Sequence, residues 1–278
     1  MDFDTLIARF GGVVSTRQLI RVGYDTEAIR AAADDGTLIR LRHGWYAVAA
    51  ADAEVVAVVE GGCLVTCASA LRHHGLWVPE GYDGLHARLT RYGRRHAPDS
   101  CRRYGRPTPA DGAIDDVATS LQYAARCLDE EGFVIVCDSA MNLGKITPDD
   151  LVDEFRRGPE SIRRLVDKCD RRAASGTETA ARLRLRAAGL NVLVQHEVPD
   201  VGWVDLLVGE CLAVELDSRD HHTGVTNYES DRRRDRLLIA DGYIPLRLTY
   251  GQVFRHWDTT YADIARIIRK RIHRRRTG

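Results

Sequence analysis

The fold of the C-terminal third follows from the segment WVDLLVGECLAVELD, residues 203–217. Two apolar runs flank a turn that contains glycine, which is the pattern of a β-hairpin. A loop of residues 209–211 gives this hairpin one fully apolar face. The apolar pairs are Val204 with Leu216, Leu206 with Val214, and Val208 with Leu212. The same register places Asp205 opposite Glu215, with Asp217 on the same face, whereas a two-residue loop would separate Asp205 and Glu215. The apolar pairing therefore predicts that three carboxylates converge.

Three carboxylates on one sheet face repel one another, and a divalent cation would neutralise them. Hard oxygen ligands suit Mg²⁺ or Mn²⁺ better than zinc. A metal bound by Asp205 and Glu215, with Asp217 beside it, would polarise a phosphodiester and activate water for hydrolysis. The alternative is a strand end whose carboxylates face solvent singly and without function. Two acids within an otherwise apolar strand favour the metal site.

A helix upstream of the hairpin carries another acid. It starts at TETAA, residues 177–181, and is expected to run to Ala188. Glu178 would extend the metal site from this helix. The alternative is a capping box in SGTE, residues 175–178, in which Glu178 returns a hydrogen bond to the amide of the N-cap residue.

Several features follow one another in a fixed order along residues 175–270. They are a helix with Glu178, a strand with Asp205, a strand with Glu215 and Asp217, the pair His221 and His222, a helix with Asp231, Arg234, Asp235 and Leu237, and GYIPLR at 242–247. This order is similar to that of the Vsr-like branch of the PD-(D/E)XK nuclease superfamily. The resemblance implies a restriction-endonuclease-like αβ domain with a central mixed sheet. It also implies metal ligation by Asp205 and Glu215, with Glu178 as the helix carboxylate.

One position departs from this family pattern. Asp217 stands where the usual member has a lysine, and no lysine lies nearby in the sequence. The cation that would orient water or stabilise the developing phosphorane charge then has to come from His221, His222 or Arg234. We favour His221 as acid, base or phosphate contact, because it lies four residues beyond Asp217. The alternatives are a surface histidine pair without function and, for Arg234, intrahelical ion pairs in place of a phosphate contact.

The first fifty residues predict three short helices followed by a β-hairpin, which is the order of a winged helix-turn-helix. The helices are expected at 4–10, 16–21 and 27–33, and the strands at 38–42 and 45–48. In such a fold the second helix of the turn fits the major groove of DNA and the hairpin lies along the backbone. The predicted DNA contacts are Arg17, Arg30, Arg40, Arg42 and His43. The alternative is a protein-docking module, but the cationic wing favours DNA.

Two segments connect this region with a known family. They are VSTRQL at 14–19, continuing to GWY at 44–46, and ALRHHGLW at 70–77. These segments resemble the N-terminal domain of the AbiEi-type antitoxins, whose members are transcriptional autoregulators. The resemblance implies DNA as a partner, together with a toxin or a second copy of the chain.

The rest of the chain completes an α+β or α/β architecture. Residues 61–106 read as short strands and residues 115–170 as helices. The predicted domains are a winged helix at 1–50, a small β-rich segment at 51–110, a helical connection at 111–172 and a nuclease-like domain at 173–278.

The composition is that of an ordinary globular protein. The chain has 278 residues, of which 44% are hydrophobic and 29% charged, so wholesale disorder is excluded and about two domains are expected. No apolar run approaches the ~18 residues of a membrane span, and the start lacks the basic residues of a signal peptide. We therefore expect a soluble, cytoplasmic protein without a membrane partner.

The formal charge of zero hides zones of opposite sign, because 40 Lys and Arg residues balance 40 Asp and Glu residues. Residues 88–106 and the C-terminal residues 266–276 are basic, and residues 111–160 are acidic. A basic zone of this kind is either a track for phosphates or a solvated face.

The seven cysteines form no Cys-x-x-Cys pair and are odd in number, which fits reduced thiols rather than a disulfide framework. The nearest approach to a zinc site is the group Cys63, Cys67, His73 and His74. Its spacing matches no common zinc finger, so buried or incidental side chains are favoured over zinc.

Together these features predict a cytoplasmic, DNA-binding, metal-dependent endonuclease. The alternative is a non-catalytic, antitoxin-like transcriptional autoregulator whose nuclease fold is degenerate, an interpretation that the missing lysine supports. A third interpretation is an RNA nuclease, such as a toxin.

Overall fold

The computed structural model describes residues 2–90, 100–106, 108–217, 225–270 and 273, with the backbone alone for 225–231. The chain divides into two compact units. Unit 1 comprises Met1–Val136 and Lys145–Asp167, and unit 2 comprises Cys137–Gly144 and Lys168–Gly278. The four domains expected from the sequence divide the chain more finely and stay a prediction. None of the described helices combines the length and the apolar character that crossing a bilayer requires.

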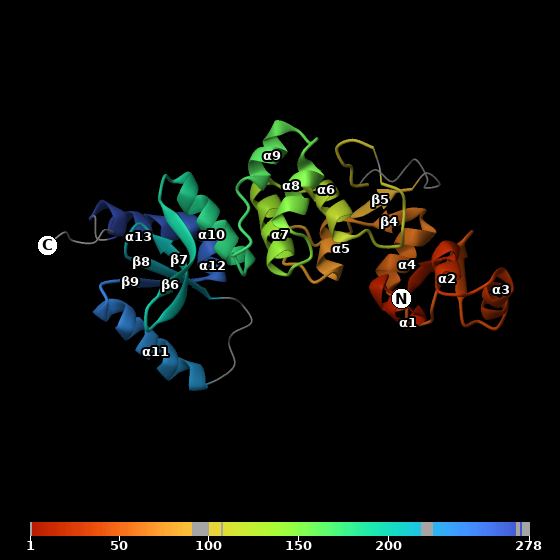
Figure 1. Ribbon diagram of the computed structural model, residues 1–278, viewed down its shortest axis with the longest axis horizontal. Coiled ribbons are helices and arrows are strands. Elements are labelled where there is room, and N and C mark those ends of the chain that lie inside the picture. Colours follow the sequence, from red (N-terminus) through yellow and green to blue (C-terminus); the bar gives the residue numbers. More distant parts are fainter. Residues whose placement is uncertain (1, 91–99, 107, 218–224, 271–272, 274–278) are drawn as a thin grey trace. The chain divides into compact units, whose positions relative to one another are not determined.

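The N-terminal region of unit 1 contains three helices and a small sheet, in the predicted order (Figure 1). Its elements are α1 (Phe3–Arg9), β1 (Val13–Ser15), α2 (Thr16–Arg21), α3 (Thr26–Asp34), β2 (Ile39–Arg42) and β3 (Trp45–Ala47). Each helix begins at a side chain that accepts a hydrogen bond from an amide of the first turn, namely Asp2, Ser15 or Asp25. Ser15 and Gln18 form a reciprocal capping box at α2. The sequence does not predict β1, because three residues are too few to show an alternating pattern.

The sheet of this region has the order β1-β3-β2, and both strand pairs are antiparallel. In the central strand, Tyr46 lies between Val14 of β1 and Arg40 of β2. The chain turns between β2 and β3 at His43 and Gly44, where Gly44 has a φ of +75°. A glycine suits this turn because it adopts a left-handed backbone without a steric penalty.

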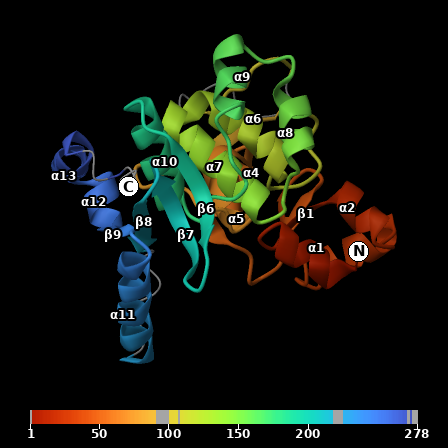
Figure 2. The same ribbon diagram turned by 60° about the vertical axis from the view of Figure 1, so that its left-hand side comes forward.

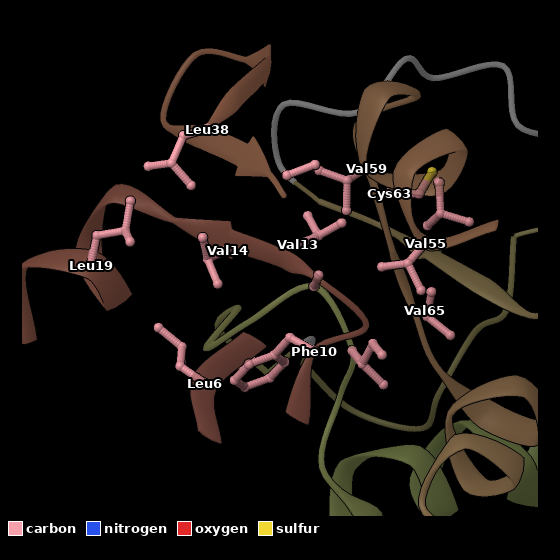
Figure 3. Packing of buried hydrophobic residues seen from close by; sticks show 14 of the residues in the cluster. Leu6, Phe10, Val13, Val14, Leu19, Leu38, Val55, Val59, Cys63 and Val65 are labelled. Carbon is pink, nitrogen blue, oxygen red and sulfur yellow. The ribbon is translucent and has the colours of Figure 1, made fainter. Parts of the chain in front are cut away.

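The N-terminal region shares one hydrophobic core with the segment that follows it (Figure 3). Leu6, Phe10 and Leu19 belong to the same buried cluster as Val55 and Val65. The last two residues lie in α4 (Ala53–Glu60) and β4 (Cys63–Val65). The core is therefore continuous beyond residue 50, and the N-terminal region obtains part of its burial from the rest of unit 1.

The remaining elements of unit 1 are mostly helical. They are α5 (Cys67–His73), β5 (Ala87–Leu89), α6 (Val117–Cys127), the first part of α7 (Glu130–Asn142), α8 (Pro148–Phe155) and α9 (Glu160–Val166). β4 and β5 pair antiparallel, so the strands expected there are confirmed, as are the helices expected over 115–170.

The expectation of strands alone over residues 61–106 is wrong, because α5 is a helix within that range. Its sequence is CASALRH, in which the apolar residues are buried and Arg72 and His73 are exposed. The buried residues are Cys67, Ala68, Ala70 and Leu71. A helix of seven residues spans only about two turns, which is too short for the helical period to be recognised with certainty from the sequence.

Unit 2 is built around a four-stranded sheet of order β6-β7-β8-β9. After the end of α7, its elements are α10 (Gly176–Ala187), β6 (Val192–Val198), β7 (Gly202–Val208), β8 (Leu212–Asp217), α11 (Val225–Ala240), β9 (Ile244–Thr249), α12 (Tyr250–Phe254) and α13 (Trp257–Arg269). The first three strands are antiparallel neighbours, and Figure 2 shows the long β6–β7 hairpin. β9 runs parallel to β8, which requires a crossover connection, and α11 lies in that connection. The mixed sheet expected for this part of the chain is confirmed.

The β7–β8 hairpin has the predicted loop and register. The pairs are Leu206 with Val214, Leu207 with Ala213, and Val208 with Leu212. The pairing of Val204 with Leu216 lies beyond this ladder. There the amide of Leu216 donates to Oδ2 of Asp205 at 2.8 Å, so a side chain accepts the hydrogen bond that a strand backbone would otherwise accept.

Candidate functional site

Gln195 of β6 joins two of the predicted carboxylates. Its Nε2 donates to Oε2 of Glu178 at 3.0 Å and to Oδ1 of Asp205 at 3.3 Å. The backbone of Gln195 has a φ of +50°, a left-handed conformation that non-glycine residues seldom adopt. Such conformations cluster at functional sites, where the surrounding structure holds them. The sequence gives no signal for Gln195, because a lone amide followed by His196 and Glu197 matches no motif.

Glu178 makes hydrogen bonds both at the start of α10 and toward the sheet. Oγ of Ser175 accepts from the Glu178 amide at 3.2 Å and donates to Oε1 of Glu178 at 3.0 Å. Oε2 of Glu178 also accepts from the amide of Ala174 at 3.1 Å. The carboxylate therefore caps the start of α10, although the amide it reaches lies one residue before the N-cap. It meets the sheet through Gln195 at the same time.

Burial raises the pKa values of the Glu178 and Asp205 carboxyls. Glu178 is 4% exposed, and burial together with the negative charge of Asp205 raises its pKa to about 7. Hydrogen bonds from Ala174, Gln195 and Ser175 act in the opposite direction. Burial also raises the pKa of Asp205, against the hydrogen bond from the Leu216 amide. Two buried carboxyls that share one amide partner thus compete for ionisation.

Glu215 of β8 lies beside an arginine. Its Oε1 is 2.8 Å from Nη2 of Arg234 on α11, and Arg234 also donates to the carbonyl of Trp203. Arg247 lies opposite Glu215 in the β8–β9 register. Burial raises the pKa of Glu215, and the charges of Arg234 and Arg247 oppose that rise. Arginine side chains therefore supply positive charge at Glu215, where the sequence predicts a divalent cation.

The predicted convergence of three hairpin carboxylates is incomplete. Asp217 is exposed at the end of β8, next to Thr249 of β9 in the register. Among the described residues, no three acids of unit 2 bring ligand atoms within 4.8 Å of one another. His221 and His222 lie outside the described residues. The structure thus brings Asp205 together with Glu178, and places Glu215 with Arg234.

The predicted DNA contacts lie at the surface of the N-terminal region. Arg17 on α2, Arg30 on α3, Arg40 on β2 and His43 in the β2–β3 turn are exposed. Arg42 differs, because its guanidinium packs over the ring of Trp45 at 5.1 Å and burial lowers its pKa. Four of the five predicted contacts are thus accessible, and the fifth supports the turn.

Arg88, assigned from sequence to a basic zone, is buried. It is 3% exposed, and its Nε and Nη2 donate to Asp115 at 2.5 and 2.7 Å. It belongs neither to a phosphate track nor to a solvated face, because Asp115 lies against it within the fold. Of the other basic residues in these zones, Arg102 and Arg106 are exposed and Arg103 is half-buried, with its guanidinium donating to Thr108. Arg91, Arg94, Arg95 and 274–276 lie outside the described residues.

A comparison with protein families finds a match for the N-terminal region. Residues 3–49 match the family model of the transcriptional regulator, AbiEi antitoxin. The match covers α1 to β3, and with them all five predicted DNA contacts of this AbiEi-type domain. The resemblance drawn from residues 14–46 is therefore confirmed, whereas the segment 70–77 lies outside the match. No curated protein matches the chain. The nuclease resemblance of residues 175–270 stays a prediction.

Proposed function

We propose that the protein is a DNA-binding transcriptional regulator whose AbiEi-type domain acts as a winged helix-turn-helix. The match over residues 3–49 carries the proposal. The element order α1-β1-α2-α3-β2-β3 and the sheet order β1-β3-β2 support it, because they provide a helical turn followed by a wing. As an antitoxin-type regulator, the protein would also have a toxin or a second copy of itself as partner.

The charge distribution suggests how this domain would bind DNA. Arg30 is the basic residue of α3, which also exposes Glu27 and Asp34. The other exposed cations flank α3, with Arg17 on α2 and Arg40 on β2. We infer that Arg30 faces the major groove while Arg17 and Arg40 contact phosphates on either side. Arg42 would hold the wing in position through Trp45.

Removing both helix arginines, in the double variant Arg17→Ala/Arg30→Ala, is expected to weaken binding to the DNA upstream of the gene by roughly 10- to 100-fold. The salt dependence should become shallower by close to one log-log unit for each removed arginine that neutralises a phosphate in the wild-type complex. Fluorescence anisotropy at several salt concentrations measures both effects. Arg157→Ala removes an exposed arginine elsewhere in unit 1 and should leave affinity unchanged. Wild-type protein that binds no DNA, or a double variant that binds as tightly, would contradict the proposal.

We propose metal-dependent phosphodiester hydrolysis in unit 2 as a second candidate function. The observation in its favour is Gln195, which in a strained backbone joins the carboxylates of Glu178 and Asp205. Burial raises the pKa of Glu215, and the negative charge of Asp205 also acts on Glu215 and raises it further. The carboxylate donors fit Mg²⁺ or Mn²⁺ in their chemistry, since these ions prefer hard oxygen ligands.

In this second function, Asp205 and Glu215 would hold the ion and Glu178 would support them. The ion would supply a Lewis acid that polarises the phosphodiester and activates water. Arg234, released from Glu215, would contact a phosphate through its guanidinium. Gln195 would keep Glu178 and Asp205 oriented. Asp217 provides no cation in place of the usual lysine, so Arg234 is our candidate for the positive charge in this part of the site.

Cleavage of plasmid DNA with Mg²⁺ or Mn²⁺ tests the second candidate. If unit 2 is a nuclease, Asp205→Asn should reduce the rate by about 100-fold or more, a loss typical for one key electrostatic group. Asp200→Asn is the matched control, because Asp200 is exposed on the same β6–β7 hairpin and asparagine tolerates its positive φ of 61°. Single-stranded RNA in a parallel reaction distinguishes an RNA nuclease. A wild-type protein that cuts neither nucleic acid leaves the regulator as the function.

A further inference from the structure

A cluster of sulfur and nitrogen ligands lies in unit 1, outside the AbiEi-type domain. Its members are Cys67, His86, Cys101 and Cys127, and one ligand atom from each lies within 4.8 Å of the other three. Cys67 is the first residue of α5, His86 directly precedes β5, and Cys127 is the last residue of α6. All seven cysteines lie among the described residues, and none of them forms a disulfide. Side chains far apart in the sequence thus bring three sulfur atoms and one imidazole nitrogen close together, and all four are potential metal ligands.

Hydrogen bonds hold the backbones around this cluster. The Thr66 amide donates to the carbonyl of His86 at 3.0 Å, and the Cys101 amide donates to the carbonyl of Ala87 at 2.8 Å. The amide of His86 in turn donates to Oγ of Ser69 at 2.9 Å. The segments that carry Cys67, His86 and Cys101 are therefore held together by bonds that do not involve the ligand atoms, which is the pre-arrangement that a metal site requires.

The backbone of Cys67 provides an independent sign of constraint. Cys67 has a φ of +52° and is fully buried. A residue with a Cβ atom is unfavourable in this left-handed conformation and persists there when its surroundings impose it. The conformation coincides with a Sγ atom placed among Cys101, Cys127 and His86. Nδ1 of His86 is 3.5 Å from Sγ of Cys101.

We propose that Cys67, His86, Cys101 and Cys127 bind one Zn²⁺ ion as a structural site. Three cysteines and one histidine are a common tetrahedral ligand set for structural zinc. With Zn–S bonds of about 2.3 Å, neighbouring sulfur atoms of a tetrahedron lie about 3.8 Å apart, which is compatible with the observed spacing. Four protein ligands leave no open position for a substrate, so the ion stabilises the fold. It joins α5, α6 and the β4–β5 sheet.

The group considered from sequence shares Cys67 alone with this site. Nε2 of His73 bonds to the carbonyl of Arg9 at 3.1 Å, and Nε2 of His74 to that of Asp115 at 2.7 Å. Cys63 is buried in the core shared with the AbiEi-type domain. The interpretation of those side chains as buried or incidental thus fits Cys63, His73 and His74, and the proposal gives Cys67 a further role. The true partners of Cys67 are too far along the chain for any spacing motif to include them.

Metal analysis of the purified full-length protein tests the site directly. Inductively coupled plasma mass spectrometry should find one zinc per chain. Replacement of zinc by Co²⁺ should give the visible d–d absorption of a tetrahedral thiolate site. Cys101→Ser and His86→Asn should lose the stoichiometric metal and the spectrum. The matched controls are Cys169→Ser, a cysteine of unit 2, and His73→Asn, the histidine grouped with Cys67 from sequence alone; both should retain one metal.

The wild-type measurements decide the question even if a ligand variant fails to fold. Folded wild-type protein that contains no zinc, and that takes up neither Zn²⁺ nor Co²⁺, would overturn the proposal. So would iron with inorganic sulfide in the purified protein, or a disulfide among Cys67, Cys101 and Cys127 found by mass spectrometry. A ligand variant that folds and still binds metal with the wild-type spectrum would also exclude this ligand set.

Discussion

Arg182→Ala is expected to lower the free energy of unfolding of unit 2 by about 3–5 kcal/mol. Nη2 of Arg182 lies 2.6 Å from Oδ2 of Asp138, and both side chains are fully buried. Asp138 also accepts from Oγ1 of Thr179 at 2.8 Å and from the amide of Asp170 at 2.7 Å. Removing the guanidinium leaves a buried carboxylate without its cation, which costs far more than an exposed ion pair contributes.

Urea unfolding followed by tryptophan fluorescence measures this loss, because Trp203 and Trp257 belong to unit 2. Arg266→Ala is the matched control. It breaks the ion pair with Asp263, in which both side chains are about two-thirds or more exposed, and should change stability by less than about 1 kcal/mol. If Arg182→Ala lowers the free energy of unfolding by less than about 1 kcal/mol, water or rearranged side chains must compensate the buried charge of Asp138.

The stability of unit 2 is expected to fall as the pH rises from 5 to 8 in metal-free buffer. The folded pKa of Glu178, about 7, lies above its ordinary value of 4.5. For an acid whose folded pKa is raised, the contribution to stability is fully present below 4.5 and is lost as the pH rises through about 7. At about 1.4 kcal/mol per pKa unit, the difference between the folded and the ordinary pKa of Glu178 corresponds to about 3 kcal/mol of unfolding free energy, which is lost by pH 8.

Unfolding of the Glu178→Gln variant at pH 5, 6, 7 and 8 isolates this effect. Glutamine keeps one acceptor for Ala174 or Gln195 and cannot ionise, so the variant should lose the part of the pH dependence that Glu178 contributes. The part due to Asp138, whose pKa burial raises to about 6, should stay. Glu197→Gln, at an exposed position of β6, should keep the wild-type profile. Identical pH profiles for wild type and Glu178→Gln would show that Glu178 is not the group that titrates.

The sequence predicted the parts of the site that depend on neighbouring residues. The apolar pairs of the β7–β8 hairpin indicated its loop and register, and the hairpin places Asp205 and Glu215 on adjoining strands. The SGTE motif indicated the start of α10 and hence the position of Glu178. The sequence did not predict Gln195, because its role depends on how β6 pairs with β7. It also did not predict Arg234 as the partner of Glu215, which follows from the packing of α11 against the sheet.

Helix starts and the hairpin loop are therefore determined by the sequence itself, because caps and turns act over a few residues. The partners of buried charges and thiols are decided by tertiary structure alone. Arg182 and Asp138 are 44 residues apart, and Arg88 and Asp115 are 27 residues apart, yet each pair is buried in direct contact. The ligands of the proposed zinc site are likewise dispersed along unit 1. A buried polar group needs a partner in space, and the packing of distant elements selects that partner.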